Sequence, residues 1–270
     1  MTDTLFDVLY DRARQELGLP TRTQTHRVTL KMPPLREVCR DLPTQTAILG
    51  VCEDGIPLLL DMHDPSPGSL LAIGESLAEV RGVLAQVAAS VCLTSSCHQV
   101  QVTVISNDVP AWQKALAGAV APTHMRGIHS PFSLEAREKV LELARLGNSR
   151  LLGRLRQPPI LLVLDDLSWV RDADHEVQVY LRWLLQNGPE HMIWLLASLQ
   201  EWAALEMHSW LPHFGTRVFG GVQHALAKQL DAPSSMIYGT ARTNGVFEVK
   251  AQEGWTRFML ADLPAYEGER

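Results

Sequence analysis

Two adjacent aspartates, Asp165 and Asp166, follow a short apolar run in the sequence ILLVLDDL at 160–167. An apolar run of this length between turn signals is typical of a strand buried on both faces of a parallel sheet, and here two prolines precede it and a serine follows it. Open α/β sheets bind ligands at the carboxyl ends of their strands. Carboxylates at that edge can hold Mg²⁺ and orient a water molecule. The plainer interpretation, a buried strand followed by an aspartate that caps a helix, stays open on this segment alone.

The rest of the chain predicts the elements that would position this pair, because apolar strands alternate with helical periodicity. The predicted strands form an opening hairpin at 47–62, single strands at 69–73, 100–105, 160–165, 191–198 and 216–219, and a closing hairpin at 246–250 and 256–260. The predicted helices cover 4–17, 77–91, 111–116, a long helix from 133, 172–185, 200–207 and 224–230. Residues 118–131 are predicted to be irregular. This order predicts an α/β fold with a mostly parallel sheet between helices and a hairpin at each end.

The composition predicts one sizeable α/β domain, with 270 residues of which 46% are hydrophobic. We divide the chain into an amphipathic helix and linker at 1–46, the domain at 47–262 and a tail at 263–270. The formal net charge of −6 does not favour nucleic acid, so contact with DNA would need a local basic patch or other subunits. Four cysteines show no disulfide or zinc spacing. We expect no signal peptide, no membrane span and a cytoplasmic location.

Four segments carry a family resemblance: SLLAIGESLAEVRGVL at 69–84, ILLVLDDL at 160–167, IWLLASLQ at 193–200 and FGTRVFGGV at 214–222. Over 47–262 the chain resembles the motor domain of the FtsK/HerA superfamily of hexameric, DNA-pumping P-loop ATPases. The resemblance implies that Asp165 would hold Mg²⁺ and that Asp166 would position the attacking water. It also implies that Ser198 and Gln200 act as sensor residues at the γ-phosphate. Arg217 would reach the nucleotide of the neighbouring subunit.

The phosphate-binding loop of this family departs from its pattern here. A P-loop needs G-x-x-x-x-G-K-[ST], in which glycines let backbone N–H groups approach the phosphates, lysine reaches the β- and γ-oxygens, and the hydroxyl binds Mg²⁺. The positions that correspond to this pattern include Gly74, Glu75, Ser76, Glu79, Val80 and Arg81.

Each replacement in this loop opposes a bound triphosphate. Glu79 stands at the second glycine and brings negative charge, Val80 offers no cation, and Arg81 cannot ligate Mg²⁺. Arg81 in the role of the lysine would leave the missing glycine and hydroxyl unexplained. The helix N-terminus keeps its dipole and could hold a weaker anion. The sequence therefore predicts no cofactor, or weakly bound ATP with Mg²⁺ on Asp165, and no hydrolysis.

Three functions remain in competition. The first is a non-catalytic P-loop subunit, a scaffold or regulatory partner that forms homo- or hetero-oligomers with an active ATPase or nuclease in a DNA-processing, DNA-translocation or secretion-type assembly. The second is an active ATP-dependent DNA translocase with an unusual phosphate loop. The third is a hydrolase on an unrelated α/β sheet that would use Ser76, His124, His129 and Asp166, although no G-x-S-x-G elbow occurs.

The acids and the tryptophans also leave alternatives. Asp165 and Asp166 are either remnants and caps, or parts of an assembly in which this subunit supplies Arg217 to a neighbour's P-loop. Tryptophan is enriched in interfaces, and the candidates for an oligomer interface are Trp169, Trp194, Trp202 and Trp210. Trp194 lies inside a predicted strand, where core packing is the simpler interpretation, so Trp202 and Trp210 are the better candidates.

Overall fold

The computed structural model describes residues 32–153, 157–236, 245–251 and 254–263, which belong to one compact unit, Met32–Arg270. The predicted helix at 4–17 and nearly all of the predicted tail lie outside the described residues.

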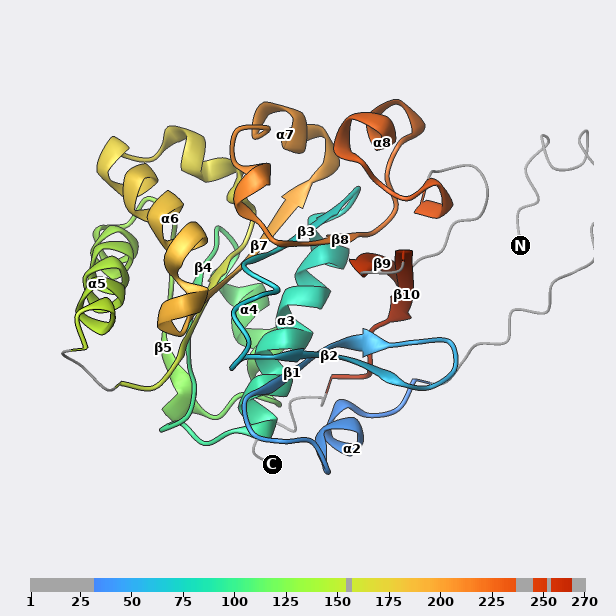
Figure 1. Ribbon diagram of the computed structural model, residues 1–270, viewed down its shortest axis with the longest axis horizontal. Helices are drawn as coiled ribbons and strands as arrows, with labels where there is room; N and C mark the ends of the chain where they lie inside the picture. Colours follow the sequence, from blue (N-terminus) through green and yellow to red (C-terminus); the bar gives the residue numbers. More distant parts are fainter. Residues whose placement is uncertain (1–31, 154–156, 237–244, 252–253, 264–270) are drawn as a thin grey trace, which may run out of the picture. The chain divides into compact units, whose positions relative to one another are not determined.

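A ten-stranded sheet organises the domain, in the order β2-β1-β10-β9-β8-β3-β7-β6-β4-β5 (Figure 1). The strands from β8 to β5 in this order run parallel, and the others pair antiparallel. Their bounds are β1 Thr46–Val51, β2 Pro57–Asp61, β3 Leu70–Gly74, β4 Gln101–Ile105, β5 Met125–His129, β6 Ile160–Leu164, β7 Ile193–Gln200, β8 Thr216–Phe219, β9 Val246–Ala251 and β10 Gly254–Met259. The mostly parallel α/β sheet with a hairpin at each end is confirmed.

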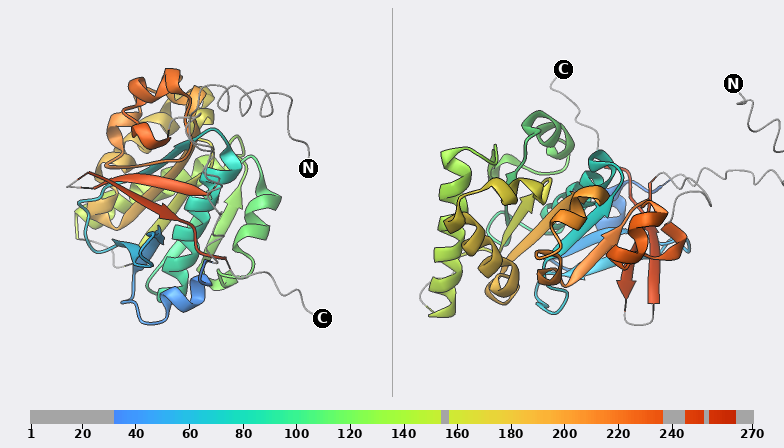
Figure 2. Two further views of the ribbon diagram at one scale, coloured as in Figure 1. Left: turned by 90° about the vertical axis from the view of Figure 1, so that its right-hand side faces the viewer. Right: turned by 90° about the horizontal axis from the view of Figure 1, so that it is seen from above.

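Helices cover both faces of this sheet (Figures 1 and 2). The α-helices are α2 Leu35–Cys39, α3 Leu77–Thr94, α4 Val109–Leu116, α5 Leu134–Leu151, α6 His175–Asn187, α7 Glu201–Glu206 and α8 His224–Leu230. Short 3-10 helices are η1 Pro122–His124, η2 Leu167–Asp172, η3 Pro189–His191, η4 Leu211–His213 and η5 Ser234–Met236.

Alternation along the strands creates two apolar cores. In β3, Leu70 and Ala72 belong to the core on the α3 side, whereas Leu71 and Ile73 belong to the core under α5, α6, α7 and α8. Helix α3 packs on β1, β3 and β7. It is the one helix in the described part that is long and apolar enough to cross a bilayer, with a mean hydropathy of 1.4 over 18 residues, of which 61% are buried. This burial in the domain core accounts for its apolar composition.

Two segments differ from what the sequence predicts. The region 118–131, predicted to be irregular, contains the edge strand β5 and η1. Its residues MRGIH are all half-buried, because among the described strands β5 pairs only with β4, and Gly127 has a φ of +138°. An edge strand with glycine and charged residues lacks the apolar run that marks a buried strand. The segment predicted to be a linker contains α2, where the fully buried Leu35 donates its backbone N–H to the carbonyl of Asp262 at 2.8 Å.

Candidate functional site

The strand order brings most of the predicted site residues to one edge of the sheet. Strand β7 lies between β3 and β6, so Gly74 pairs with Gln200 and Ala72 pairs with Ser198. Asp165 follows β6 directly, at the same carboxyl edge. This is the edge at which open α/β sheets bind ligands.

Asp165 lies at the centre of a closed network of hydrogen bonds. Its side chain is 2% exposed. Oδ2 accepts from Ser106 Oγ at 2.7 Å, from Trp112 Nε1 at 2.9 Å and from Arg81 Nε at 3.0 Å. Oδ1 accepts from Ser198 Oγ at 2.9 Å. Both oxygens are therefore engaged by side chains of this chain.

Arg81 brings a positive charge to Asp165, the acid that would hold Mg²⁺ according to the family resemblance. Its Nη2 also lies 3.0 Å from Asp165 Oδ2, and its Nη1 donates to Asp108 Oδ2 at 3.0 Å. The backbone N–H of Ala111, and then the Arg81 guanidinium, hold the pKa of Asp108 below its usual value. Since the guanidinium sits between two carboxylates, it neutralises a place where a divalent cation would otherwise be attracted.

The turn after β3 is too short to wrap a phosphate chain. Helix α3 begins at Leu77, so only Glu75 and Ser76 separate it from Gly74. The residues that would complete a P-loop, up to Glu79, form the first turn of the helix instead. Glu75 is exposed beside this turn.

Val80 fills the space behind the turn. Its side chain is fully buried, and a Cβ on Gly74 would lie 3.0 Å from Val80 Cγ1. On the other side, Glu75 donates its backbone N–H to the carbonyl of Gly221 at 3.0 Å. The glycine that opens the predicted motif thus serves close packing between strand and helix.

Asp166 caps the next helix. It adopts a left-handed conformation with a φ of +57°, and its Oδ1 accepts from Ser168 Oγ at 2.7 Å and from Ser168 N at 3.3 Å, at the start of η2. Its own backbone N–H donates to Ser198 Oγ at 2.9 Å. The capping interpretation is confirmed for Asp166.

Gln200 is hydrogen-bonded at both ends of its amide. Nε2 donates to the carbonyl of Glu75 at 3.1 Å, and Oε1 accepts from Trp202 Nε1 at 3.1 Å. The indole of Trp202 is 57% exposed, so it presents a large apolar surface at this edge. By contrast Trp210, which the sequence also placed at an interface, is 4% exposed under the guanidinium of Arg182 at 4.5 Å, so that prediction is wrong.

Arg217 lies apart from the Asp165 network. It is on β8, in register with Leu71, and its Nη2 donates to the carbonyl of Leu211 at 3.0 Å. With Lys250 and Trp255 it lines a separate cavity of about 270 Å³. Its role toward a neighbouring subunit stays a prediction.

The structure does not assemble the hydrolase constellation. Ser76 follows β3 and His129 ends β5, which is four strands away, or about 19 Å at the usual strand spacing. His124 precedes β5, where its Nε2 lies 3.1 Å from the carbonyl of Ser95. The side chain of Asp166 is occupied by its cap. The prediction that Ser76, His124, His129 and Asp166 form one catalytic group is therefore wrong for this chain.

Three residues of the Asp165 network were not predicted as site residues. Ser106 and Asp108 follow the strand at 101–105, so the rule that strand ends carry sites could have found them. Trp112 gave no such signal, since it reads as an apolar residue of a helix. Within the described residues no cluster of three or more potential metal ligands occurs, and all four cysteines are free.

Solved structures with the same fold are P-loop ATPases. EccC of Thermomonospora curvata (ATPases 2 and 3, with a signal sequence peptide) is 13% identical with a TM-score of 0.63, and the alignment covers 94% of this chain and 47% of that one. The pCW3 conjugation coupling protein TcpA, with ATPγS, is 13% identical with a TM-score of 0.63, over 88% of this chain and 70% of that one. The cytoplasmic domain of EssC is 13% identical with a TM-score of 0.61, over 97% and 55%.

The fold is thus that of FtsK/HerA-type P-loop ATPases, at low sequence identity. The chain spans about half the length of the EccC and EssC chains that it matches. No protein-family model and no curated protein matches the sequence.

Proposed function

We propose that this chain is a non-catalytic FtsK/HerA-like P-loop domain that acts as a scaffold or regulatory subunit in a secretion-, DNA-translocation- or DNA-processing-type assembly. It would form homo- or hetero-oligomers with an active ATPase or nuclease in the cytoplasm. The structural neighbours support the type of assembly, because they include a conjugation coupling protein and the cytoplasmic domain of the type VII secretion ATPase EccC. Contact with DNA would come through the partner subunits.

The observation that carries this proposal is the guanidinium of Arg81 on Asp165. In an active P-loop site this carboxylate faces Mg²⁺, which neutralises the charge that develops on the phosphates. Here the guanidinium of Arg81 takes the position of the metal and donates to Asp165 Oδ2, and Ser198 Oγ donates to Oδ1. Mg²⁺ would have to displace the guanidinium from two carboxylates.

The electrostatics of the turn add to this argument. Glu75 and Glu79 flank the place of the phosphates, and Val80 supplies no cation. One unit charge pair at 4 Å is worth about 4 kcal/mol at an effective dielectric constant of 20. Replacing one attractive charge pair by one repulsive pair therefore changes the binding free energy by more than the roughly 4 kcal/mol that separates millimolar from micromolar affinity.

Calorimetry with the full chain tests the proposal. We expect no saturable heat when ATP or ADP with Mg²⁺ is titrated up to about 1 mM. A micromolar isotherm would contradict a non-catalytic site and favour the divergent ATPase. Phosphate release that DNA stimulates and that Asp166→Asn abolishes would establish that alternative.

Co-purification from the native host, followed by mass spectrometry, tests the assembly. We expect an active ATPase or nuclease among the bound proteins, and less of it with Trp202→Ser, since this indole is exposed at the site edge. Ile56→Ser is the matched control, because Ile56 is 61% exposed in the turn between β1 and β2. Recovery of neither type of enzyme would refute the scaffold role.

A further inference from the structure

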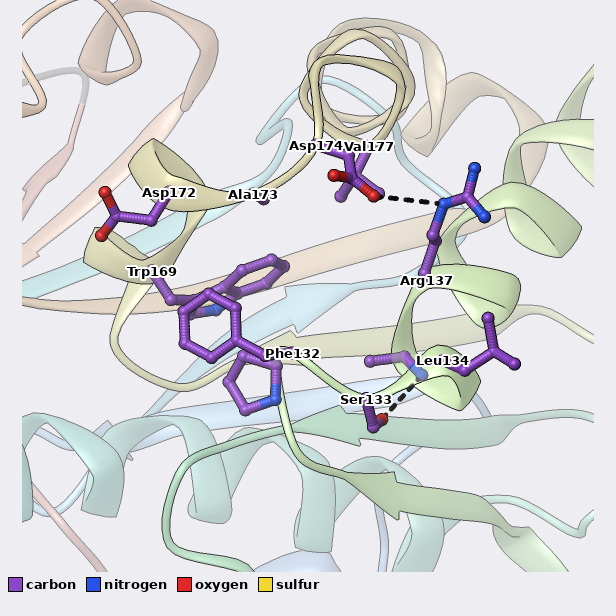
Figure 3. A pocket seen from close by; sticks show the side chains of 11 residues that line it. Phe132, Ser133, Leu134, Arg137, Trp169, Asp172, Ala173, Asp174 and Val177 are labelled. Atoms are coloured by element: carbon purple, nitrogen blue, oxygen red, sulfur yellow. Dashed lines mark hydrogen bonds and ion pairs between the residues drawn. The ribbon is translucent and has the colours of Figure 1, made fainter.

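A further pocket lies at the carboxyl edge of the sheet, with a volume of about 360 Å³ (Figure 3). It lies between the start of α5, which follows β5, and the segment from η2 to α6, which follows β6. Among the described residues it shares no lining residue with the Asp165 network. Open α/β sheets bind ligands at this edge, and a pocket of this size is large enough for a small organic ligand.

The walls of this pocket are apolar. Phe132 and Leu134 line it from the start of α5 and are 64% and 62% exposed. Val177 lines it from α6 and is buried. The ring of Phe132 packs edge-on against Trp169 of η2, with 6.5 Å between the ring centroids. An apolar group that entered the pocket would therefore remove two exposed apolar side chains from water.

Two hydrogen-bond donors of the pocket lack an acceptor. Trp169 is 4% exposed, and its Nε1 has no hydrogen-bond partner among the described residues. Arg137 Nε is also buried without a hydrogen-bond partner there, and Asp174 Oδ2 lies 3.4 Å from it. Figure 3 shows Arg137 on the opposite side of the pocket from Trp169. Buried donors are normally paired, so a donor left open beside a pocket marks a place for the acceptor of a ligand.

The rim of this pocket is acidic. Asp172 and Asp174 line it, and their side chains are 65% and 71% exposed. All the lining residues belong to the described segments 131–137 and 167–177. These two segments contain four acids, two arginines and one histidine, so their formal charge is negative.

The two arginines already have carboxylate partners. Arg137 pairs with Asp174 at 3.4 Å and with Glu176 at 2.6 Å. Arg171 pairs with a glutamate of α7 and lies 3.9 Å from Asp172. Within the described residues this long contact is the one ion pair of Asp172. Asp172 is therefore the carboxylate of the rim that can best receive a cation from outside the chain.

We propose that this pocket binds an organic cation that also carries an apolar ring or branched chain and a carbonyl group. The apolar group packs on Phe132 and Leu134, the carbonyl accepts from Trp169 Nε1, and the cationic group lies beside Asp172. A cation at this place also faces the exposed ring of Phe132, which adds cation–π attraction. The site is separate from Asp165, so this proposal does not rest on the proposed function.

Two sources offer this chemistry: a free amine of low mass, and an apolar residue next to lysine or arginine in a peptide. L-phenylalaninamide is the probe for the first, since it has a ring, an amide carbonyl and an ammonium group. The capped dipeptide acetyl-Phe-Arg-amide is the probe for the second. N-acetyl-L-phenylalaninamide is the neutral control, because it keeps the ring and the carbonyl and has no cation.

NMR of the indole N–H groups in the full chain tests the site directly. Trp169→Phe assigns the Trp169 resonance, and thermal melts check that this variant keeps its fold. Titration of L-phenylalaninamide to about 20 mM should move this resonance with a millimolar dissociation constant, as expected for a ligand of about a dozen non-hydrogen atoms. If neither probe gives a saturable shift of this resonance, the proposal is overturned. A saturable shift confined to other tryptophans overturns it as well.

A charge variant tests the cation. N-acetyl-L-phenylalaninamide should bind about three- to fivefold more weakly than L-phenylalaninamide at low salt, and Asp172→Asn should remove this difference. Glu190→Gln is the matched control, because Glu190 is exposed in η3, at the other end of α6, and it should keep the difference. Equal binding of the two ligands to the wild type would overturn the choice of a cation.

An apolar variant locates the ring of the ligand. Phe132→Ser should weaken both L-phenylalaninamide and its neutral control at least about fivefold, since the ring packs on Phe132. Ile56→Ser is the matched control, because Ile56 is 61% exposed in the turn between β1 and β2, and it should bind like the wild type. Unchanged binding to Phe132→Ser would show that the ligand lies elsewhere.

The two probes distinguish the sources of the ligand. Binding of acetyl-Phe-Arg-amide about tenfold tighter than that of L-phenylalaninamide supports a peptide segment, and weaker or equal binding supports a free amine. Calorimetry with ATP reports on the Asp165 site and not on this pocket. Failure of this proposal and failure of the proposed function are therefore observed in separate experiments.

Discussion

Replacing Arg81 by methionine should destabilise the domain by about 3 kcal/mol. The change removes the cation from Asp165, whose side chain is 2% exposed, and keeps the apolar stem. Removing one partner of a buried ion pair typically costs about 3–5 kcal/mol. Ser106, Trp112 and Ser198 still donate to Asp165, which places the expected value at the lower end of that range.

Urea unfolding gives the measurement, and thermal melts give a second one. For a domain of this size a change of 1 kcal/mol moves Tm by about 2–4 °C, so we expect a decrease of about 6–12 °C. Arg145→Met is the matched control, because Arg145 is exposed on α5, and it should change stability by less than about 0.5 kcal/mol.

A double-mutant cycle separates the ion pair from the other effects of the substitution. Asp165→Asn alone should also destabilise, since it leaves Arg81 with Asp108 as its remaining partner. The two changes together should cost less than their sum by about 2 kcal/mol, because residues in contact are not additive. Additive effects, or a loss below about 0.5 kcal/mol for Arg81→Met, would refute the view that Arg81 neutralises this site.

Three further predictions concern other parts of the domain. Gly50→Ala should destabilise by about 2 kcal/mol or more in urea unfolding, because its Cβ would overlap the ring of Phe258, whereas Gly153→Ala, with open space and a φ of +67°, should cost about 1 kcal/mol. Burial raises the pKa of Glu201, so its stabilising contribution is present below about pH 4.5 and is lost as the pH rises through the raised pKa. Glu201→Gln should therefore gain stability relative to the wild type between pH 4.5 and 7 in the same assay, and a constant difference would contradict this. Burial raises the pKa of Cys92 to about 12, so mass spectrometry should find this thiol unlabelled by alkylating reagents at pH 8 until urea unfolds the protein.

The sequence predicted the elements whose signals are local. The run at 160–164 is apolar throughout and forms a strand buried on both faces, which fixed the place of Asp165 at the sheet edge. Strand β5 was not predicted, because Arg126, Gly127 and His129 interrupt its apolar pattern. Its pairing with β4 depends on the tertiary structure. Local signals therefore sufficed for central strands and failed at the edge.

The chemistry of the site depended on contacts between distant residues. The sequence showed that Arg81 cannot ligate Mg²⁺, but its hydrogen bond to Asp165 joins residues 84 positions apart. Trp112 reaches the same oxygen across 53 positions. Trp202 and Trp210 illustrate the same limit, since the first lies in the short helix α7 and the second follows that helix, and only the first is exposed. Which side of an element faces solvent depends on what packs against it.

The tethered cation at Asp165 differs from a metal ion in one respect that bears on function. Mg²⁺ enters and leaves a P-loop site with its nucleotide, so the site alternates between states and can drive movement. The guanidinium of Arg81 is covalently attached to α3 and bonded to Asp165, and Gln200 is held by both Glu75 and Trp202. A ligand shifts an equilibrium only by its differential affinity for two states. For the non-catalytic role that we propose, an edge whose side chains bond one another would offer a constant surface for assembly rather than a cycle of closure and release.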